Sequence, residues 1–324
     1  MGASTEKLIE LLKTENTIEN IKSEMNLTTK QLLYRLNLIK NKAYTVQKKY
    51  YGNSDVTISL SNSCEYINNN YTNIYTKKTE NEIRFLVISD LHLFNKYEDR
   101  KAIDKVYNYC IKNNIHNILI CGDLIDCMEK NEISIEKQVA LFSKIYPYDK
   151  SILNFCVLGN HDFIPIKKEK IDFKNVIENN RIDIIPIDYF EAGICIKNDR
   201  IYLRHPIGNA RSKYSGDKYD RIRFIGHSHV SKVIGTNIYV PSLSYVVTGN
   251  VKKNRCYIPQ ALDTTLCFSK YGIITNCCVD QLIVSDSIYI ISEQEIRMQN
   301  AQVVKRNIEI DKYPSEKIKV KHHI

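Results

Sequence analysis

The sequence predicts an α/β domain that is preceded by a small helical domain. From residue 82 onward, short apolar runs that suit buried strands alternate with segments of helical periodicity. Before residue 50, apolar residues recur at spacings of three and four, which is typical of amphipathic helices. The 324 residues are 43% hydrophobic and 26% charged, which is ordinary for a globular protein and excludes wholesale disorder.

The first 60 residues are expected to form a domain of their own. Thr28 to Gln31 matches a capping box, and a turn at 52–55 separates two strand-like runs. The elements expected are helices at about 5–14, 17–24 and 29–41 and hairpin strands at 43–51 and 56–60. Three helices followed by a hairpin resemble a winged helix-turn-helix domain.

The charge pattern of this domain suggests a nucleic-acid partner. Between residues 28 and 50 there are basic residues and no acidic ones, while the acidic residues gather on the first two helices. In a helix-turn-helix the third helix enters the major groove and the wing meets phosphate. The residues expected to contact nucleic acid are Lys30, Arg35, Lys40, Lys42, Lys48 and Lys49. The alternative is a dimerisation or regulatory module whose basic face is merely solvated.

The rest of the chain divides by composition. Residues 61–81 are polar and rich in Asn, and we expect a linker. Residues 82–296 form the α/β domain, with strands and helices alternating up to 180 and strands dominating after 181. We expect strands near 84–88, 115–121 and 152–158, helices near 98–113, 133–145 and 167–180, and then strands near 182–185, 193–197, 200–203, 223–225, 238–240 and across 257–292. Residues 297–324 are expected to be a basic, irregular tail.

Composition also bears on compartment and partners. The chain has 46 Lys and Arg against 37 Asp and Glu, and its net charge of +9 is compatible with a nucleic-acid partner. The 10 cysteines lie mostly in apolar runs without a Cys-x-x-Cys pair, which favours reduced thiols. No apolar stretch approaches the length of a membrane span, so we expect a cytoplasmic protein that has no membrane partner.

Five short motifs lie at or just beyond the ends of expected strands. They are Asp90-Leu91-His92, Gly122-Asp123, Gly159-Asn160-His161-Asp162, His205 and Gly226-His227-Ser228-His229. Ligands of open α/β sheets gather beyond the carboxyl ends of strands, so these side chains should converge. The motifs contain five of the eight histidines, together with aspartate and asparagine oxygens. Such donors suit two divalent metals bridged by a carboxylate, with Mn²⁺ favoured and Fe, Zn, Co or Ni compatible.

The motifs, in this order, resemble the calcineurin-like metallophosphoesterase superfamily over about residues 83–292. The resemblance implies a four-layer α/β/β/α sandwich that binds two metals at its strand ends. It implies that Asp90, His92, Asp123 and His229 hold one metal, and that Asp123, Asn160, His205 and His227 hold the other. It further implies that a metal-bridging hydroxide attacks phosphorus while His161 protonates the leaving oxygen. Asp126 either orients the imidazole of His161 or caps a helix.

Departures from the family pattern narrow the range of activities that we expect. The phosphoprotein phosphatases of this superfamily carry an arginine where Cys127 stands and another where Leu158 stands. The remaining motifs look more like the phosphodiesterase and SbcD-type nuclease branches. We therefore expect a phosphodiesterase or nuclease that acts on nucleic acid through the N-terminal domain. Open alternatives are a nucleotide phosphodiesterase or phosphatase that uses this domain for dimerisation or regulation, and a DNA-binding regulator whose metal domain is a sensor.

Overall fold

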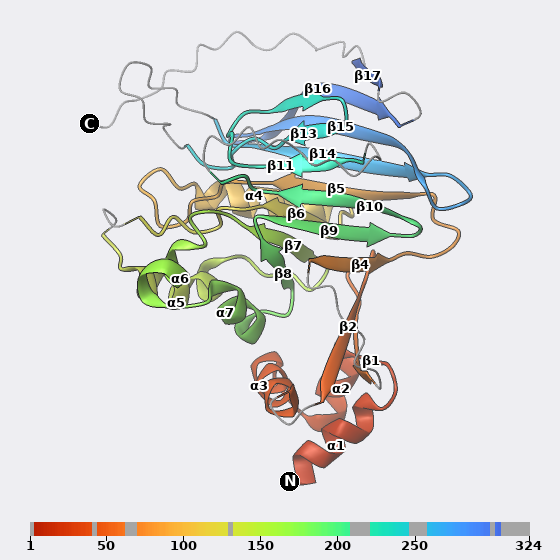
Figure 1. Cartoon of the computed structure of the whole chain (residues 1–324), viewed down its shortest axis with the longest axis vertical. Coiled ribbons are helices and arrows are strands. Elements are labelled where there is room, and N and C mark those ends of the chain that lie inside the picture. Colours follow the sequence, from red (N-terminus) through yellow and green to blue (C-terminus); the bar gives the residue numbers. More distant parts are fainter. Residues whose placement is uncertain are drawn as a thin grey trace.

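The computed structural model describes residues 3–40, 44–61, 70–128, 132–207, 221–245, 258–298 and 302–305. It is a mixed α/β structure in which two large sheets pack together, with helices on the outside of one sheet and at one end (Figure 1). One sheet has eight strands and the other has nine. Among the described residues, no helix is long and apolar enough to cross a membrane.

The eight-stranded sheet carries the expected alternation of strands and helices. Its parallel strands are β5 (Glu82–Ile88), β6 (Asn117–Cys121), β7 (Leu153–Leu158) and β8 (Ile184–Tyr189). The connecting helices are α4 (Arg100–Lys112), α5 (Ile135–Ile145), α6 (Ile164–Glu169) and α7 (Phe173–Asn180). The antiparallel strands β14 (Gln260–Phe268), β15 (Ile274–Val284), β16 (Ile288–Arg297) and β17 (Gln302–Lys305) complete the sheet beyond β5.

The nine-stranded sheet joins the N-terminal region to the rest of the chain. Its order is β1-β3-β2-β4-β9-β10-β11-β13-β12. The strands are β1 (Asn16–Thr17), β2 (Thr45–Tyr51), β3 (Val56–Ser61), β4 (Tyr71–Tyr75), β9 (Glu191–Ile196), β10 (Asp199–Arg204), β11 (Arg223–Ile225), β12 (Lys232–Ile234) and β13 (Asn237–Tyr239). Strand β4 pairs in parallel with both β2 and β9, so it is the link between the two halves of this sheet.

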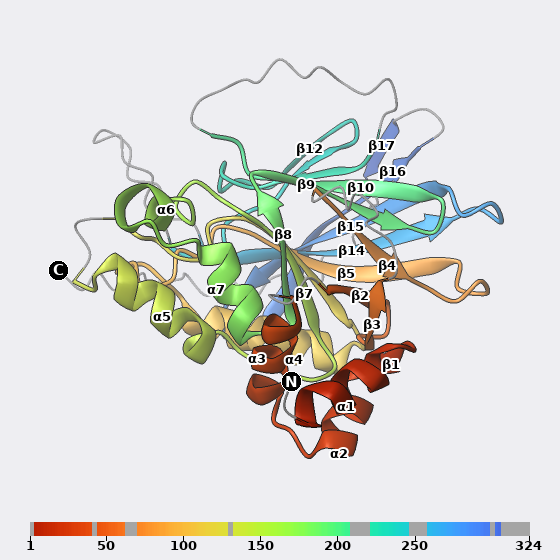
Figure 2. The ribbon, with the colours of Figure 1, turned by 60° about the horizontal axis from the view of Figure 1, so that its bottom comes forward.

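Alternating residues of the central strands divide the core into two layers. On β5, Phe85 and Val87 pack in the core between the sheets, whereas Leu86 and Ile88 pack under the helices with Phe142 of α5. This period of two is what a strand with both faces buried requires. None of the described helices packs over β9–β13 (Figure 2). The outer helical layer that the resemblance implied on that sheet is therefore not formed by the described residues.

The N-terminal helices and the hairpin form where the sequence places them. The helices are α1 (Ala3–Leu12), α2 (Ile18–Met25) and α3 (Thr29–Lys40), and the capping box closes as expected, with Gln31 Oε1 accepting from Thr28 N at 2.9 Å. Their apolar faces are, however, continuous with the core between the sheets. Leu8 and Leu36 belong to the same core as Phe85 and Phe155 of the central strands. The hairpin likewise continues the nine-stranded sheet, so the winged-helix interpretation is not confirmed.

Three other expectations about the elements need correction. The linker expected at 61–81 contains β4. This strand has no apolar pattern that predicts it, because it is mostly polar and only its Ile74 is buried. The helix expected at 167–180 is two helices, since Lys170 has φ 58 and ends α6 in the left-handed region. The tail expected from 297 begins with an ordered strand, because β17 pairs with β16. The described cysteines are all free thiols, as expected.

Candidate metal centre

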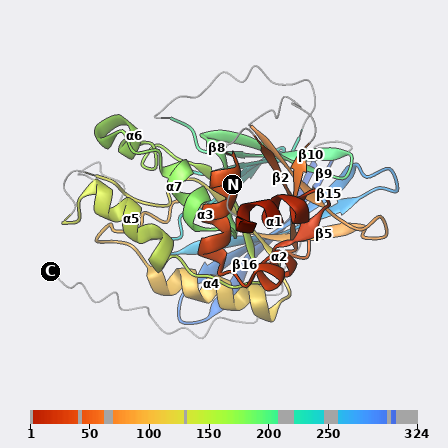
Figure 3. The same cartoon turned by 90° about the horizontal axis from the view of Figure 1, so that it is seen from below.

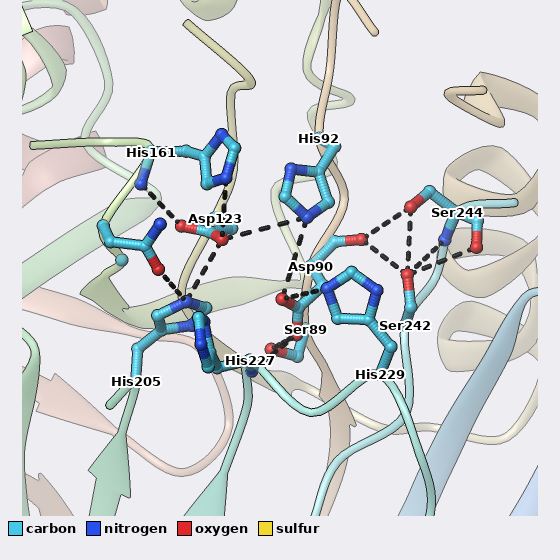
Figure 4. A network of polar contacts seen from close by, with 12 residues as sticks. Ser89, Asp90, His92, Asp123, His161, His205, His227, His229, Ser242 and Ser244 are labelled. Carbon is cyan, nitrogen blue, oxygen red and sulfur yellow. Dashed lines mark hydrogen bonds and ion pairs between the residues drawn. The ribbon is translucent and has the colours of Figure 1, made fainter. Parts of the chain in front are cut away.

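The five motifs meet at one place, at the carboxyl ends of their strands (Figure 4). Asp90 and His92 follow β5, Asp123 follows β6, and Asn160 and His161 follow β7 of the eight-stranded sheet. His205 follows β10, and His227 and His229 follow β11 of the other sheet. Both sheets thus contribute donors to one cluster, which is the convergence that the sequence predicted.

Asp123 lies at the middle of the cluster. Its Oδ2 is 3.1 Å from Nε2 of His205, 3.8 Å from Nε2 of His92 and 4.0 Å from Nε2 of His161. Its Oδ1 accepts a hydrogen bond from the backbone N–H of His161 at 2.9 Å. A carboxylate that faces several imidazoles in this way is placed to be shared between two cations.

Asp90 is the second buried carboxylate of the cluster. Its Oδ1 lies 3.1 Å from Nε2 of His229 and 3.8 Å from Nε2 of His92. Its Oδ2 accepts from the hydroxyl of Ser89 at 2.6 Å and from the backbone N–H of His227 at 2.9 Å. The carboxylate is thereby held on one oxygen, and the other oxygen faces the imidazoles.

Two observations indicate that these donors are suited to divalent cations. His92 is buried, yet neither ring nitrogen has a hydrogen-bond partner in the described part of the chain. An orphaned buried imidazole between two carboxylates is costly unless a cation takes its lone pair. Three groups of donors also lie close enough to share an ion: Asp90, His92 and His229; His92, Asp123 and His161; and Asp123, His205 and His227.

Backbone strain marks the same residues. Asp90, His92, Asp123, His227 and His229 all have positive φ, between 46° and 69°. Non-glycine residues seldom adopt this region, and each instance costs of order 1–3 kcal/mol. Strain concentrated at one cluster of donors is typical of a functional site.

Buried electrostatics favour positive charge at this position. Burial would lower the pKa of His205, but Asp123 outweighs it and raises that pKa to about 10. Burial would raise the pKa of Asp90, but the neighbouring histidines, His229 foremost, lower it. The two carboxylates therefore draw cations or protons to the imidazoles, and metal binding competes with protonation.

His161 and Asp126 form a separate contact at the edge of the cluster. Oδ1 of Asp126 lies 3.3 Å from Nδ1 of His161 and also 3.3 Å from Nδ1 of His92. The backbone carbonyl of Asp126 accepts from Nδ1 of His161 at 2.6 Å. Burial would lower the pKa of His161, but Asp126 and Asp123 outweigh burial and raise that pKa to about 9. Asp126 precedes no helix directly, since α5 begins only at Ile135, so the helix-cap alternative does not apply.

Three supporting groups lie outside the predicted set of metal ligands and catalytic residues. Buried Asp162 accepts from the backbone N–H groups of Leu124, Ile125 and Gly159, and so ties two metal loops together. The hydroxyls of Ser242 and Ser244 both donate to the carbonyl of Asp90 at 2.9 Å (Figure 4). Their position in the sequence indicates this role: Asp162 is the last residue of the motif that begins at Gly159, and both serines follow the last histidine motif.

The residues expected to contact nucleic acid do not form one free basic face. Lys49 is ion-paired with Glu15, which also accepts from the hydroxyls of Tyr51 and Thr57 at 2.7 Å. Lys40 and Lys48 line a cavity between the N-terminal region and the sandwich. Lys30 is exposed and Arg35 is half-buried on α3, and Lys42 lies outside the described residues.

The comparisons with known proteins agree with the site. Residues 83–231 match the calcineurin-like phosphoesterase family, and this segment contains every predicted metal ligand. The chain therefore carries a calcineurin-like phosphoesterase domain, and the protein is a metal-dependent phosphoric ester hydrolase. No curated protein matches the chain significantly.

Two solved structures show weaker similarity. Yfce, a phosphoesterase from E. coli, is 15% identical with a TM-score of 0.40, covering 65% of this chain and 98% of its own. The nuclease MPE from Pseudomonas putida is 12% identical with a TM-score of 0.29, covering 55% of this chain and 83% of its own. At these scores neither structure bears on the activity or substrate of this protein.

Proposed function

We propose that the cluster binds two divalent cations, with Asp123 shared between them. Asp90, His92 and His229 hold the first cation together with Asp123, and Asn160, His205 and His227 hold the second. The observation that supports this proposal most directly is the position of Asp123 Oδ2, which faces His92 of the first set and His205 of the second. Oxygen and imidazole donors suit Mn²⁺ best in this proposal, and Fe, Zn, Co or Ni remain compatible.

The proposed reaction is hydrolysis of a phosphodiester. Bound cations would neutralise phosphate oxygens and supply a water-derived nucleophile at neutral pH. His161 contributes a proton to the leaving oxygen from Nε2, because its Nδ1 is held by the carbonyl and carboxylate of Asp126. Because Nδ1 donates to Asp126, donation from Nε2 starts from the imidazolium and leaves the neutral ring with its proton on Nδ1; Nε2 lies 4.0 Å from Asp123 Oδ2.

Nucleic acid is the first substrate that we propose. The net charge of +9 and the exposed Lys30 of α3 favour a polyanion. Cleavage of end-labelled single- and double-stranded DNA and RNA by the Mn²⁺-loaded protein tests this proposal, with Asp123→Asn in parallel. Cleavage by the wild type alone supports a nuclease.

A small phosphodiester such as a cyclic nucleotide is the second candidate. One observation favours it: Lys49 is ion-paired to Glu15 and Lys48 faces a cavity, so neither is displayed on an open basic face. Turnover of cyclic nucleotides by protein that leaves DNA and RNA intact would establish this candidate instead. If neither is cleaved, hydrolysis of bis-p-nitrophenyl phosphate still tests the reaction apart from the natural substrate.

A further inference from the structure

A cavity of about 710 Å³ lies where the N-terminal region meets the sandwich. Its walls come from the end of α3, from β2 and β4, from α7 and β8, and from β9. Figure 3 shows α3 beside α7, and Asn37 of α3 donates to Asn179 of α7 at 2.7 Å. Small-molecule and cofactor pockets commonly enclose about 300–1,000 Å³.

The charges that line this cavity are unbalanced. Its lining includes the basic residues Lys40, Lys48, Lys174, Arg181 and Arg200, but Glu178 is the one acidic residue that the described lining includes. Cations that converge in a partly enclosed space repel one another unless an anion joins them.

Arg181 is fully engaged and serves the fold. Its guanidinium donates to both carboxylate oxygens of Asp183, at 2.8 and 2.6 Å, and to the carbonyl of Tyr146 at 2.8 Å. The ammonium of Lys174 donates to the carbonyl of Ile187 at 2.6 Å and has two further N–H donors. Arg181 therefore shapes the wall, whereas Lys174 can still bind an anion.

Lys40 and Lys48 make no hydrogen bond or ion pair within the described residues. Lys48 is half-buried on β2, and Lys40 is the last residue of α3. Burial and the charge of Lys40 lower the pKa of Lys48 to about 8, against the opposing influence of Glu178. An ammonium that loses part of its hydration without gaining a partner costs free energy, and an anion in the cavity would offset that cost.

Arg200 completes the cation set from the β9–β10 side. Its guanidinium lies 5.5 Å from the ring centre of Tyr71 and 6.0 Å from that of Tyr202, and it donates to the hydroxyl of Tyr71 at 3.3 Å. The rings hold the guanidinium in place and leave other N–H donors free. Tyr50 and Tyr71 also line the cavity, so an aromatic wall stands beside the cations.

We propose that this cavity binds a small phosphate-bearing anion of nucleotide size, through Lys40, Lys48, Lys174 and Arg200. The site is distinct from the metal centre, because no metal ligand lines it. The cavity is lined by the first residues of β8. The metal centre lies beyond the opposite end of β8, where the N–H of the proposed metal ligand His205 donates to the carbonyl of Phe190. A ligand there would join the N-terminal region to the phosphoesterase domain and stabilise both.

Calorimetric titration of the full chain with inorganic pyrophosphate and with ADP tests this proposal. The protein is first stripped of metal with EDTA, so that phosphate has no cation to bind at the centre. The test variant is Lys48→Met, with Lys48→Arg retaining the charge and Lys30→Met removing an exposed lysine outside the cavity. Asp123→Asn separates this site from the proposed active site, since binding should persist in it.

We expect saturable binding that Lys48→Met weakens by about tenfold or more, as loss of a charge-assisted hydrogen bond predicts. Lys48→Arg, Lys30→Met and Asp123→Asn should bind as the wild type does. Tighter binding of ADP than of pyrophosphate places the nucleoside against the tyrosines, and equal binding assigns the site to the phosphates alone. Absence of binding by either probe, or an unchanged Kd in Lys48→Met, overturns the proposal. If Lys48→Met does not fold, Arg200→Gln is judged by the same criterion.

Discussion

Oδ1 of Asp126 lies at the same distance, 3.3 Å, from Nδ1 of His161 and from Nδ1 of His92. One carboxylate thus lies beside both a proposed metal ligand and the proposed acid, although neither ring nitrogen of His92 has a hydrogen-bond partner among the described residues. Outer carboxylates of this kind fix the ring and raise the basicity of its far nitrogen. The proposed acid is therefore tied to the geometry of the metal centre.

Asp126→Asn should slow turnover by about 10–100-fold, because the amide holds the imidazoles less firmly. The substitution also removes the charge that raises the pKa of His161. A general acid works only while protonated, so activity falls as pH rises through its pKa. The alkaline limb of the kcat profile should therefore shift to lower pH in the variant. A slower enzyme with an unshifted alkaline limb would show that Asp126 does not act through His161.

His161→Ala should lose roughly 10²–10⁴-fold in rate while retaining its metal. The deficit should be smaller with bis-p-nitrophenyl phosphate than with an alkyl phosphodiester, because p-nitrophenolate leaves without a proton. Metal analysis and parallel kinetics on both substrates check this prediction. Since His161 Nε2 lies 4.0 Å from Asp123 Oδ2, loss of metal in the variant would make His161 a ligand instead.

Gly159→Ala should disrupt the centre. A Cβ at Gly159 would collide with the carboxylate and the backbone nitrogen of Asp123, so one of the two loops must move. The matched control is Gly235→Ala, where φ is +57° but no heavy atom lies within 4 Å of the added carbon. We expect Gly159→Ala to lose metal and activity, and Gly235→Ala to lose only about 1 kcal/mol of stability. Equal metal affinity in both variants would contradict the close approach of the loops.

Glu15→Gln should lower stability at neutral pH but not in strong acid. Its hydrogen bonds to Lys49, Tyr51 and Thr57 lower the pKa of Glu15 from 4.5 to about 2. A carboxyl group with a lowered folded pKa stabilises the fold above its unfolded pKa, and that contribution disappears as pH falls toward 2. Because Glu15 is 34% exposed, we expect at most about 1 kcal/mol.

Thermal unfolding of the wild type and Glu15→Gln between pH 7 and pH 2 measures this contribution. The control is Glu10→Gln, whose partner Lys13 and whose own side chain are far more exposed. The Tm difference between wild type and Glu15→Gln should shrink as pH falls below about 4.5. A difference that stays constant with pH would show that the Glu15 contact is not electrostatic.

The site was more predictable from sequence than the domain organisation. The metal motifs come directly after apolar strands. The carboxyl ends of neighbouring parallel strands lie at the same edge of a sheet, so Asp90, Asp123 and Asn160 could be grouped from the sequence alone. Strand β4 could not be found in this way. Its pairing with β2 and β9 depends on hydrogen bonds between distant segments, and its side chains are mostly polar.

The N-terminal region shows the limit of local patterns. Amphipathic spacing correctly located α1, α2 and α3, but it does not say what their apolar faces pack against. These helices contact one another and the hairpin strands, and their leucines belong to an apolar cluster that continues into the core between the sheets. In the same way, a run of lysines does not reveal that Lys49 pairs with Glu15 or that Lys48 faces a cavity.

The most direct test of the account is to measure metal content and phosphodiester hydrolysis together in Asp123→Asn. The control is Asp286→Asn, which alters an aspartate exposed on the surface. The account predicts two cations per chain in the wild type and in the control. In Asp123→Asn it predicts substantial metal loss and at least about a thousandfold slower hydrolysis, because both ligand sets share this carboxylate. An Asp123→Asn protein that keeps two cations and hydrolyses at the wild-type rate would contradict it.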